Sequence, residues 1–251
     1  MSNKRFDAVI SDIDGCLGPE SSGPLDAELL AKVADHNVRA KRDRDRPLVT
    51  LCSGRPLPYA EAICRLIGND RLPCVCEMGV WVLDLSSHSY HMDPAITPAQ
   101  LEGVREAQRW IEKDLLPHGV LVQPGKSASI SLWHRDTAYL MSLKPMLIDR
   151  FTERGWPLRV SSTVAWVNCD LAHVSKASGI ARLKQMTGLE SDRLVGIGDT
   201  TGDLAIREHV AFFACPSNAQ EELKRHADYI SPFPEVRGVL DILDRVAAIS
   251  R

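Results

Sequence analysis

The sequence has few of the features that mark membrane, nucleic-acid-binding or disulfide-stabilised proteins. It has no long apolar run, and the short one in the opening segment MSNKRFDAVISD is soon interrupted by charge, so neither a signal peptide nor a membrane span is expected there. The formal net charge is only −3, which leaves no global basic field to hold nucleic acid. We therefore expect neither membrane nor nucleic-acid partners.

The seven cysteines form no recognisable framework. Their number is odd, their spacing is irregular, and Cys74 and Cys76 make a lone C-x-C pair with no second pair to complete a zinc site. Buried reduced thiols are the simpler interpretation, and the cytoplasm is the expected location.

Charge is concentrated in one segment, residues 39–46, where five basic side chains are interleaved with Asp43 and Asp45. A nucleic-acid patch would need nearby aromatic side chains, which this segment lacks. A solvated loop between a helix and a strand is the favoured interpretation.

The two ends of the chain have the rhythm of an α/β protein. Residues 6–11, 47–52 and 193–198 are apolar without alternation, which is typical of strands buried on both faces. Helices are predicted over residues 25–36, 59–67 and 176–187. Strands that alternate with helices in this way predict a parallel sheet covered by helices on both sides.

The middle of the chain has a different order. Thr97, Pro98 and Gln100 form the signature of a capped helix that runs to about residue 116. Strands near 119–123 and 129–134, a helix over 145–154, and strands near 158–161 and 165–169 follow. Short adjacent strands predict an antiparallel sheet with helices on one face. We expect an α+β unit at residues 85–172 inserted into an α/β domain made of residues 1–84 and 173–251.

Four polar clusters lie at or near the ends of the predicted parallel strands, where open α/β sheets bind ligands. Asp12 and Asp14 suit nucleophilic and acid–base chemistry and a magnesium site. The hydroxyl, bare backbone and guanidinium of Ser53-Gly54-Arg55 suit phosphate binding. The third cluster is Lys176, and the fourth is Asp199 with Asp203. Each of the four also has a simpler interpretation: an acidic turn, a common Ser-Gly turn, a solvated lysine and a helix N-cap, respectively.

Taken together, the order of these clusters resembles the four motifs of the haloacid dehalogenase superfamily. The segment DIDG resembles its first motif, TLCSGR its second, Lys176 its third and GDTTGD its fourth. The inserted helix-strand-strand unit resembles the type-two cap of the Cof-like branch, which includes archaeal-type phosphoglycolate phosphatases, mannosyl-3-phosphoglycerate phosphatases and sucrose phosphatases. The resemblance implies a Rossmannoid parallel-sheet core with an inserted α+β cap.

The resemblance also implies roles for single residues. Asp12 would form an aspartyl-phosphate, Asp14 would act as general acid and base, Ser53 would bind the phosphoryl group, and Lys176 would steady its charge. Magnesium (Mg²⁺) would be held by Asp12, by the backbone carbonyl of Asp14 and by Asp199, with Asp203 nearby. Substrate-binding candidates are Gly54, Arg55, Asn218 in the late turn that resembles the branch's Gly-Asn-Ala turn, and the cap residues Lys126, His134 and Arg135.

The function implied is that of a magnesium-dependent phosphatase acting on a small phosphate ester, either a sugar phosphate or a phosphoglycolate-like molecule. A phosphomutase or phosphotransferase, or a catalytically inactive metabolite-binding member, shares the same motifs and stays open, as does the choice between monomer and homodimer. The sequence departs from the branch at Met78 and Gly202, where the branch usually has asparagine.

Overall fold

The computed structural model describes residues 6–20 and 23–249. It divides the chain into two compact units, of which unit 1 comprises Met1–His91 and Lys176–Arg251 and unit 2 comprises Met92–Ser175. These boundaries lie slightly later in the chain than the expected 84/85 and 172/173. Within the described residues, no helix is both long and apolar enough to cross a membrane.

Unit 1 is built on a five-stranded parallel sheet with the order β12-β11-β10-β1-β2. Its central strand, β1, pairs with β10 through Ala8 and Leu194 and with β2 through Ala8 and Leu48. The predicted parallel sheet and the α/β fold class are thereby confirmed. The strands are β1 (Ala8–Ser11), β2 (Leu48–Leu51), β10 (Leu194–Ile197), β11 (Phe212–Cys215) and β12 (Tyr229–Ile230).

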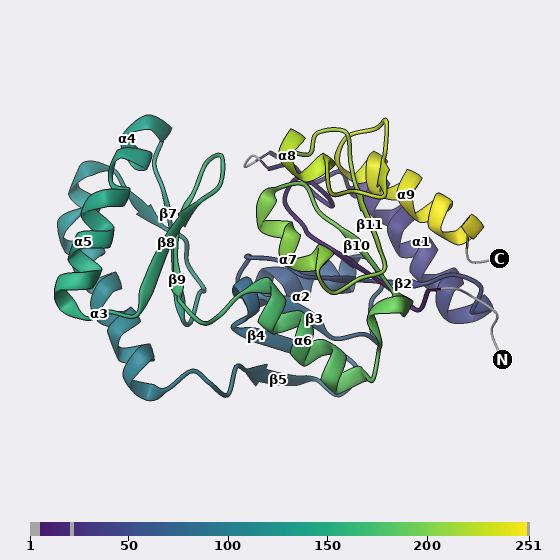
Figure 1. The fold of residues 1–251 in the computed structure, drawn as a ribbon, viewed down its shortest axis with the longest axis horizontal. Helices are drawn as coiled ribbons and strands as arrows, with labels where there is room; N and C mark the ends of the chain where they lie inside the picture. The colour runs from purple at the N-terminus through teal and green to yellow at the C-terminus, as the bar shows by residue number, and fades with distance from the viewer. Residues whose placement is uncertain (1–5, 21–22, 250–251) are drawn as a thin grey trace. The chain divides into compact units, whose positions relative to one another are not determined.

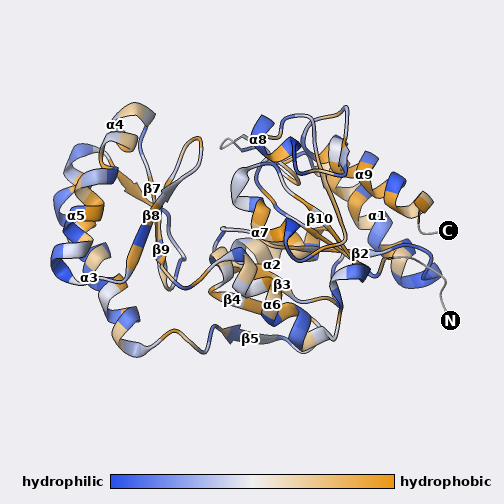
Figure 2. Cartoon of the chain, in the orientation of Figure 1, coloured by the Kyte–Doolittle hydropathy of each residue, from blue (hydrophilic) through white to orange (hydrophobic). Residues whose placement is uncertain are grey.

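Helices cover both faces of this sheet because the strands are apolar on both sides. Val9 joins the core cluster that includes residues of α1, α2 and α9, whereas Ala8 and Ile10 join the cluster that includes residues of α6 and α7. Figure 2 shows the apolar residues gathered along these strands. The helices are α1 (Ala27–Asp43), α2 (Leu57–Leu66), α6 (Lys176–Thr187), α7 (Leu204–Arg207), α8 (Glu221–Lys224) and α9 (Glu235–Ile249).

The structure corrects the expectation of a loop at residues 39–46. Helix α1 continues to Asp43 and ends at Arg44, which adopts a left-handed conformation with φ 56°. Charges of the segment pair locally, since Arg42 contacts Asp43 at 2.7 Å and Arg46 contacts Asp45 at 2.8 Å. The last part of the helix buries Asn37 and Ala40, so the charged composition of the segment does not mark a loop.

A smaller sheet of three strands follows α2 in unit 1. Strands β3 (Cys74–Cys76) and β4 (Trp81–Asp84) are antiparallel, and β5 (Ser89–Met92) completes the sheet. The turn between β3 and β4 contains Met78 with φ 57°, a left-handed backbone that few residues with a side chain adopt.

Unit 2 is an antiparallel sheet with helices against it, in the predicted order of helix, strands, helix and strands. The sheet order is β6-β7-β9-β8, and Figure 1 shows α3 and α5 on the same side of it. The capping box of Thr97 and Gln100 is present at the start of α3. The short helix α4 was not expected. The elements are α3 (Pro98–Asp114), β6 (Leu121–Val122), β7 (Ser129–Trp133), α4 (Thr137–Ser142), α5 (Lys144–Arg154), β8 (Leu158–Ser162) and β9 (Val167–Leu171).

Candidate functional site: an acidic cluster at the carboxyl edge of the parallel sheet

Asp12 directly follows the central strand β1 and is buried, with 7% of its surface exposed. One carboxylate oxygen, Oδ1, accepts a hydrogen bond from the backbone N–H of Ile13 at 2.7 Å. The other, Oδ2, lies 2.7 Å from the ammonium group of Lys176. The strand end and these two contacts fix the position of the carboxylate.

Lys176 is the first residue of α6, and its ammonium group lies between two acids. It contacts Asp12 at 2.7 Å and Asp203 Oδ1 at 2.6 Å. Burial lowers the pKa of this lysine, but the carboxylates of Asp12 and Asp203 outweigh that effect and raise the pKa well above its usual value. Lys176 is therefore a fixed positive charge beside Asp12.

Asp203 is held on both sides of its carboxylate. While Oδ1 accepts from Lys176, Oδ2 accepts hydrogen bonds from the backbone N–H groups of Asp199 at 3.0 Å and Thr200 at 3.1 Å. The side chain is fully buried. Since both of its oxygens are already engaged, Asp203 is placed to orient Lys176 and the loop after β10.

Asp199 differs from Asp203 because part of its carboxylate is unused. Its Oδ1 is buried and has no hydrogen-bond partner in the described part of the chain. Burial and the nearby charges of Asp12 and Asp203 raise the pKa of Asp199 to about 9. A buried oxygen without a donor is costly unless a cation or a ligand uses it.

The charge balance of this cluster suits a divalent cation. Oxygen atoms of Asp12, Asp199 and Asp203 lie within 4.8 Å of one another, and Lys176 supplies only one balancing charge. Burial raises the pKa of Asp12 to about 7 even though Lys176 acts to lower it. Crowded carboxylate oxygens are the donor set that Mg²⁺ prefers, so the residues present fit the metal expected from the sequence.

The turn after Asp12 passes so close to Asp199 that only glycine fits at position 15. Gly15 has φ +74°, and a Cβ atom there would overlap Oδ2 of Asp199 and lie 3.0 Å from its Oδ1. Gly198 similarly has no room for a side chain beside Asp203. Backbone from two distant segments thus closes around the acids.

Asp14 forms an ion pair with Arg55 that the sequence did not predict. The guanidinium group of Arg55 donates from Nε to Oδ2 at 2.8 Å and from Nη2 to Oδ1 at 2.5 Å. Arg55 also lies over the ring of Tyr59, 5.0 Å from its centroid. Asp14 and Arg55 follow the adjacent strands β1 and β2, which is the one sequence signal that could have suggested their contact.

The other predicted residues of unit 1 lie around this turn. Ser53 is fully buried, and its Oγ accepts a hydrogen bond from the backbone N–H of Arg55 at 3.2 Å. Asn218 donates from its amide to the carbonyl of Gly15 at 2.9 Å and accepts from the backbone N–H of Glu235 at 2.7 Å. Asn218 therefore braces the Asp12–Gly15 turn.

Gly54 and the three predicted cap residues have neighbours other than the acidic cluster. A Cβ atom on Gly54 would lie 3.2 Å from Met78 Sδ. In unit 2, Lys126 donates to Ser131 Oγ at 2.5 Å. His134 packs on the ring of Tyr139, bonds with its Nδ1 to the Asp136 backbone, and thereby has a structural role in the turn before α4. Arg135 is exposed.

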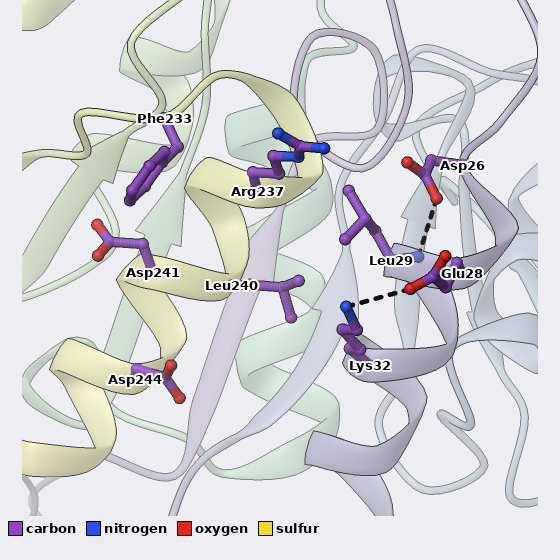
Figure 3. A pocket seen from close by; sticks show the side chains of 9 residues that line it. All are labelled: Asp26, Glu28, Leu29, Lys32, Phe233, Arg237, Leu240, Asp241 and Asp244. Carbon is purple, nitrogen blue, oxygen red and sulfur yellow. Dashed lines mark hydrogen bonds and ion pairs between the residues drawn. The ribbon is translucent and has the colours of Figure 1, made fainter.

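A surface groove of about 470 Å³ lies elsewhere in unit 1, between α1 and α9. Figure 3 shows Phe233, Arg237 and Leu240 on one side and Leu29 and Lys32 on the other. None of the residues predicted to carry chemistry lines this groove.

The parallel sheet makes this an α/β protein. The three acids and the lysine at the carboxyl edge of the sheet form a site of a kind that can bind a cation. A family model described as haloacid dehalogenase-like hydrolase matches residues 162–243. A phosphoglycolate phosphatase of Methanospirillum hungatei is 24% identical over 238 residues, which cover 94% of each chain.

Solved structures agree with this assignment at the level of the fold. One from Thermoplasma acidophilum has a TM-score of 0.75 at 19% identity and covers 96% of this chain and 98% of its own. The sucrose-phosphatase of Synechocystis has a TM-score of 0.65 at 18% identity and covers 96% and 98%. The chain is thus similar to the haloacid dehalogenase-like hydrolases over residues 162–243, in agreement with the resemblance carried by the motifs, and it shares the fold of these solved structures.

Proposed function

We propose that this protein is a magnesium-dependent phosphatase that hydrolyses a small phosphorylated metabolite through an aspartyl-phosphate on Asp12. The observation that carries the proposal is the meeting of Asp12, Lys176 and Asp199 from three separate segments at one sheet edge. The phosphatase names of similar curated proteins support the same reaction.

In the first step, a carboxylate oxygen of Asp12 attacks phosphorus, a new P–O bond forms, and the bond from phosphorus to the ester oxygen breaks. Asp14 gives its proton to the departing oxygen. In the second step, water attacks the aspartyl-phosphate, Asp14 takes a proton from that water, and inorganic phosphate leaves. Asp12 is thereby regenerated.

Asp14 must be released from Arg55 to perform this proton transfer. In the structure the two groups form a bidentate pair, so Asp14 and a phosphoryl group would compete for the same guanidinium. A phosphoryl group is itself a bidentate acceptor for a guanidinium. We propose that Arg55 exchanges Asp14 for phosphoryl oxygens of the substrate, while Ser53 provides a further hydrogen bond.

The metal would be held by Asp12 and Asp199, with the backbone carbonyl of Asp14 as a further ligand. Bound magnesium supplies positive charge that offsets the negative charge of the phosphoryl group during transfer. Lys176 would orient Asp12, and Asp203 would orient Lys176 and the backbone at Asp199. Unit 2 would act as the cap that admits small phosphate esters.

The test is phosphate release from p-nitrophenyl phosphate with and without magnesium, for the wild type and for Asp12→Asn. We expect magnesium-dependent turnover in the wild type and none above background in Asp12→Asn. Asp192→Asn, which changes an exposed acid of unit 1, serves as the matched control and should retain turnover. A folded Asp12→Asn protein with wild-type turnover would refute the role of Asp12.

A further inference from the structure

The 53–55 loop, which carries Ser53 and Arg55, is held by a neighbouring turn of the chain. That turn is Glu77–Gly79, between β3 and β4. The backbone N–H of Glu77 donates to the carbonyl of Arg55 at 2.9 Å. The backbone N–H of Met78 donates to the carbonyl of Ser53 at 3.1 Å. The positions of both proposed phosphate-binding residues therefore depend on the position of the Glu77–Gly79 turn.

The backbone of this turn is one that most of its residues do not favour. Glu77 has φ 50° and Met78 has φ 57°, and Gly79 follows with φ 105°. A left-handed backbone is unfavourable for a residue with a side chain. Two such residues in succession persist only where the surrounding structure holds them. The turn is therefore expected to depend on contacts with other segments.

Helix α6 provides contacts of this kind. It lies so close to β3 and the turn (Figure 1) that a Cβ atom on Gly179 would approach Val75 Cγ1 to 2.4 Å and Gly79 Cα to 3.0 Å. Further along the helix, the guanidinium group of Arg182 donates from Nη2 to the carbonyl of Gly79. Its Nη1 donates to the carbonyl of His91, in β5, at 3.3 Å. Arg182 thus ties the turn and the end of β5 to α6.

The same helix also positions the nucleophile. Lys176 is the first residue of α6, and its ammonium group lies 2.7 Å from Asp12 Oδ2. One continuous helix therefore contacts Asp12 through its first residue and the Glu77–Gly79 turn through Arg182. Because a helix is a stiff element, this arrangement sets the 53–55 loop at a defined place relative to Asp12.

We propose that Arg182 is a positioning residue, which acts through the Glu77–Gly79 turn to hold Ser53 and Arg55 where they bind the phosphoryl group. The inference rests on the proposed function for its reaction. It also makes a claim about phosphate binding that can be measured without turnover.

The test measures KM and kcat for p-nitrophenyl phosphate and the inhibition constant of inorganic phosphate. In Arg182→Met, KM and the inhibition constant should both rise about 10-fold, a magnitude typical of a lost hydrogen bond to a charged group. The value of kcat should change less, because the loop binds the phosphoryl group both before and during its transfer. Arg39→Met, which removes an exposed arginine of α1, is the matched control and should change neither constant.

A purely structural role for Arg182 predicts a different result. Arg182→Met would then have a lower unfolding temperature but wild-type values of KM and of the inhibition constant, which would overturn the proposal and leave the phosphatase intact. Arg182→Lys has one donor group in place of the two-armed guanidinium, so both constants should rise by only about 3-fold. Wild-type constants in Arg182→Lys, or constants equal to those of Arg182→Met, would contradict the proposal.

A double-mutant cycle with Arg55 separates positioning from a direct effect of charge. If the charge of Arg182 attracted phosphate directly, the losses caused by Arg182→Met and Arg55→Met would add. If Arg182 acts through the 53–55 loop, Arg182→Met should weaken phosphate inhibition only about 2-fold in the Arg55→Met background. Additive losses would overturn the proposal.

If the wild type hydrolyses no p-nitrophenyl phosphate, the proposed function fails and binding decides the inference. Titration calorimetry with inorganic phosphate in the presence of magnesium should then show binding to the wild type that is about 10-fold weaker in Arg182→Met. Equal binding by the two proteins, or no binding by the wild type, would refute the inference.

Discussion

Replacing Gly15 by alanine should damage the acidic cluster without removing any of its charged groups. Gly15 has φ +74°, and the new Cβ would overlap Asp199 Oδ2. Ordinary contacts of a Cβ are 3.4–4 Å, so the Asp199 carboxylate has to move by more than about 1 Å, a displacement that can cost roughly 100-fold in rate. The overlap itself should cost about 1–3 kcal/mol.

Gly188→Ala is the matched control for this prediction. Gly188 has a similar backbone, with φ +70°, but a Cβ atom added there would have no neighbouring atom within 4 Å. Both variants should lose about 1–2 kcal/mol from the left-handed backbone. Only Gly15→Ala should show the further loss, which corresponds to an unfolding temperature lower by about 2–12 °C.

Turnover of p-nitrophenyl phosphate with magnesium then gives the functional comparison. We expect kcat of Gly15→Ala to be about 100-fold below that of Gly188→Ala, and its stabilisation by magnesium to be largely lost. Equal kcat in the two folded variants would refute the reasoning that the close approach of this turn positions Asp199.

Three further predictions test separate parts of the site. The pKa values of Asp12 and Asp199 in the folded protein, about 7 and about 9, are raised above their unfolded values, so the metal-free protein should lose stability as the pH rises from about 4 to 9. Because magnesium binds the unprotonated carboxylates, the increase in unfolding temperature on adding magnesium should grow over pH 6–9. An increase that shrinks with pH would contradict this. Met78→Asn should raise stability by about 1 kcal/mol in urea unfolding, because asparagine tolerates the left-handed backbone better, and a loss of stability would argue against strain at this position. Asn218→Ala should lower stability by about 1–3 kcal/mol through its two lost hydrogen bonds, whereas an effect on KM alone would restore the substrate-binding interpretation.

The proximity of Asp12 and Asp199 could be predicted from the sequence. Asp12 and Asp199 follow apolar strands, and parallel strands end at the same edge of a sheet, so their proximity could be predicted without coordinates. Lys176 was harder to place from the residues alone, because a lysine in a first helical turn is usually solvated. Its position depended on the order of all four motifs.

Side-chain partners could not be predicted in the same way. The pairing of Asp14 with Arg55 and the saturation of Asp203 by backbone N–H groups depend on rotamers and turn geometry that sequence spacing does not determine. Met78 is a related case: the sequence suggested a missing amide, whereas the structure adds a left-handed backbone as a reason why asparagine suits the position. Helix α1 continues beyond its predicted end and buries Asn37 and Ala40 there, a packing contact that the charged composition of residues 39–46 does not reveal.

The central place of β1 has a consequence for synthesis on the ribosome. One edge of β1 pairs with β2, which follows soon after it, but the other edge pairs with β10, whose last residue is Ile197. At about 5–20 residues per second, that second edge stays unpaired for on the order of ten seconds while the intervening chain is made. Unit 2 is continuous in sequence and can form first, so the nascent chain carries an open strand edge that is prone to pairing with other chains until β10 emerges.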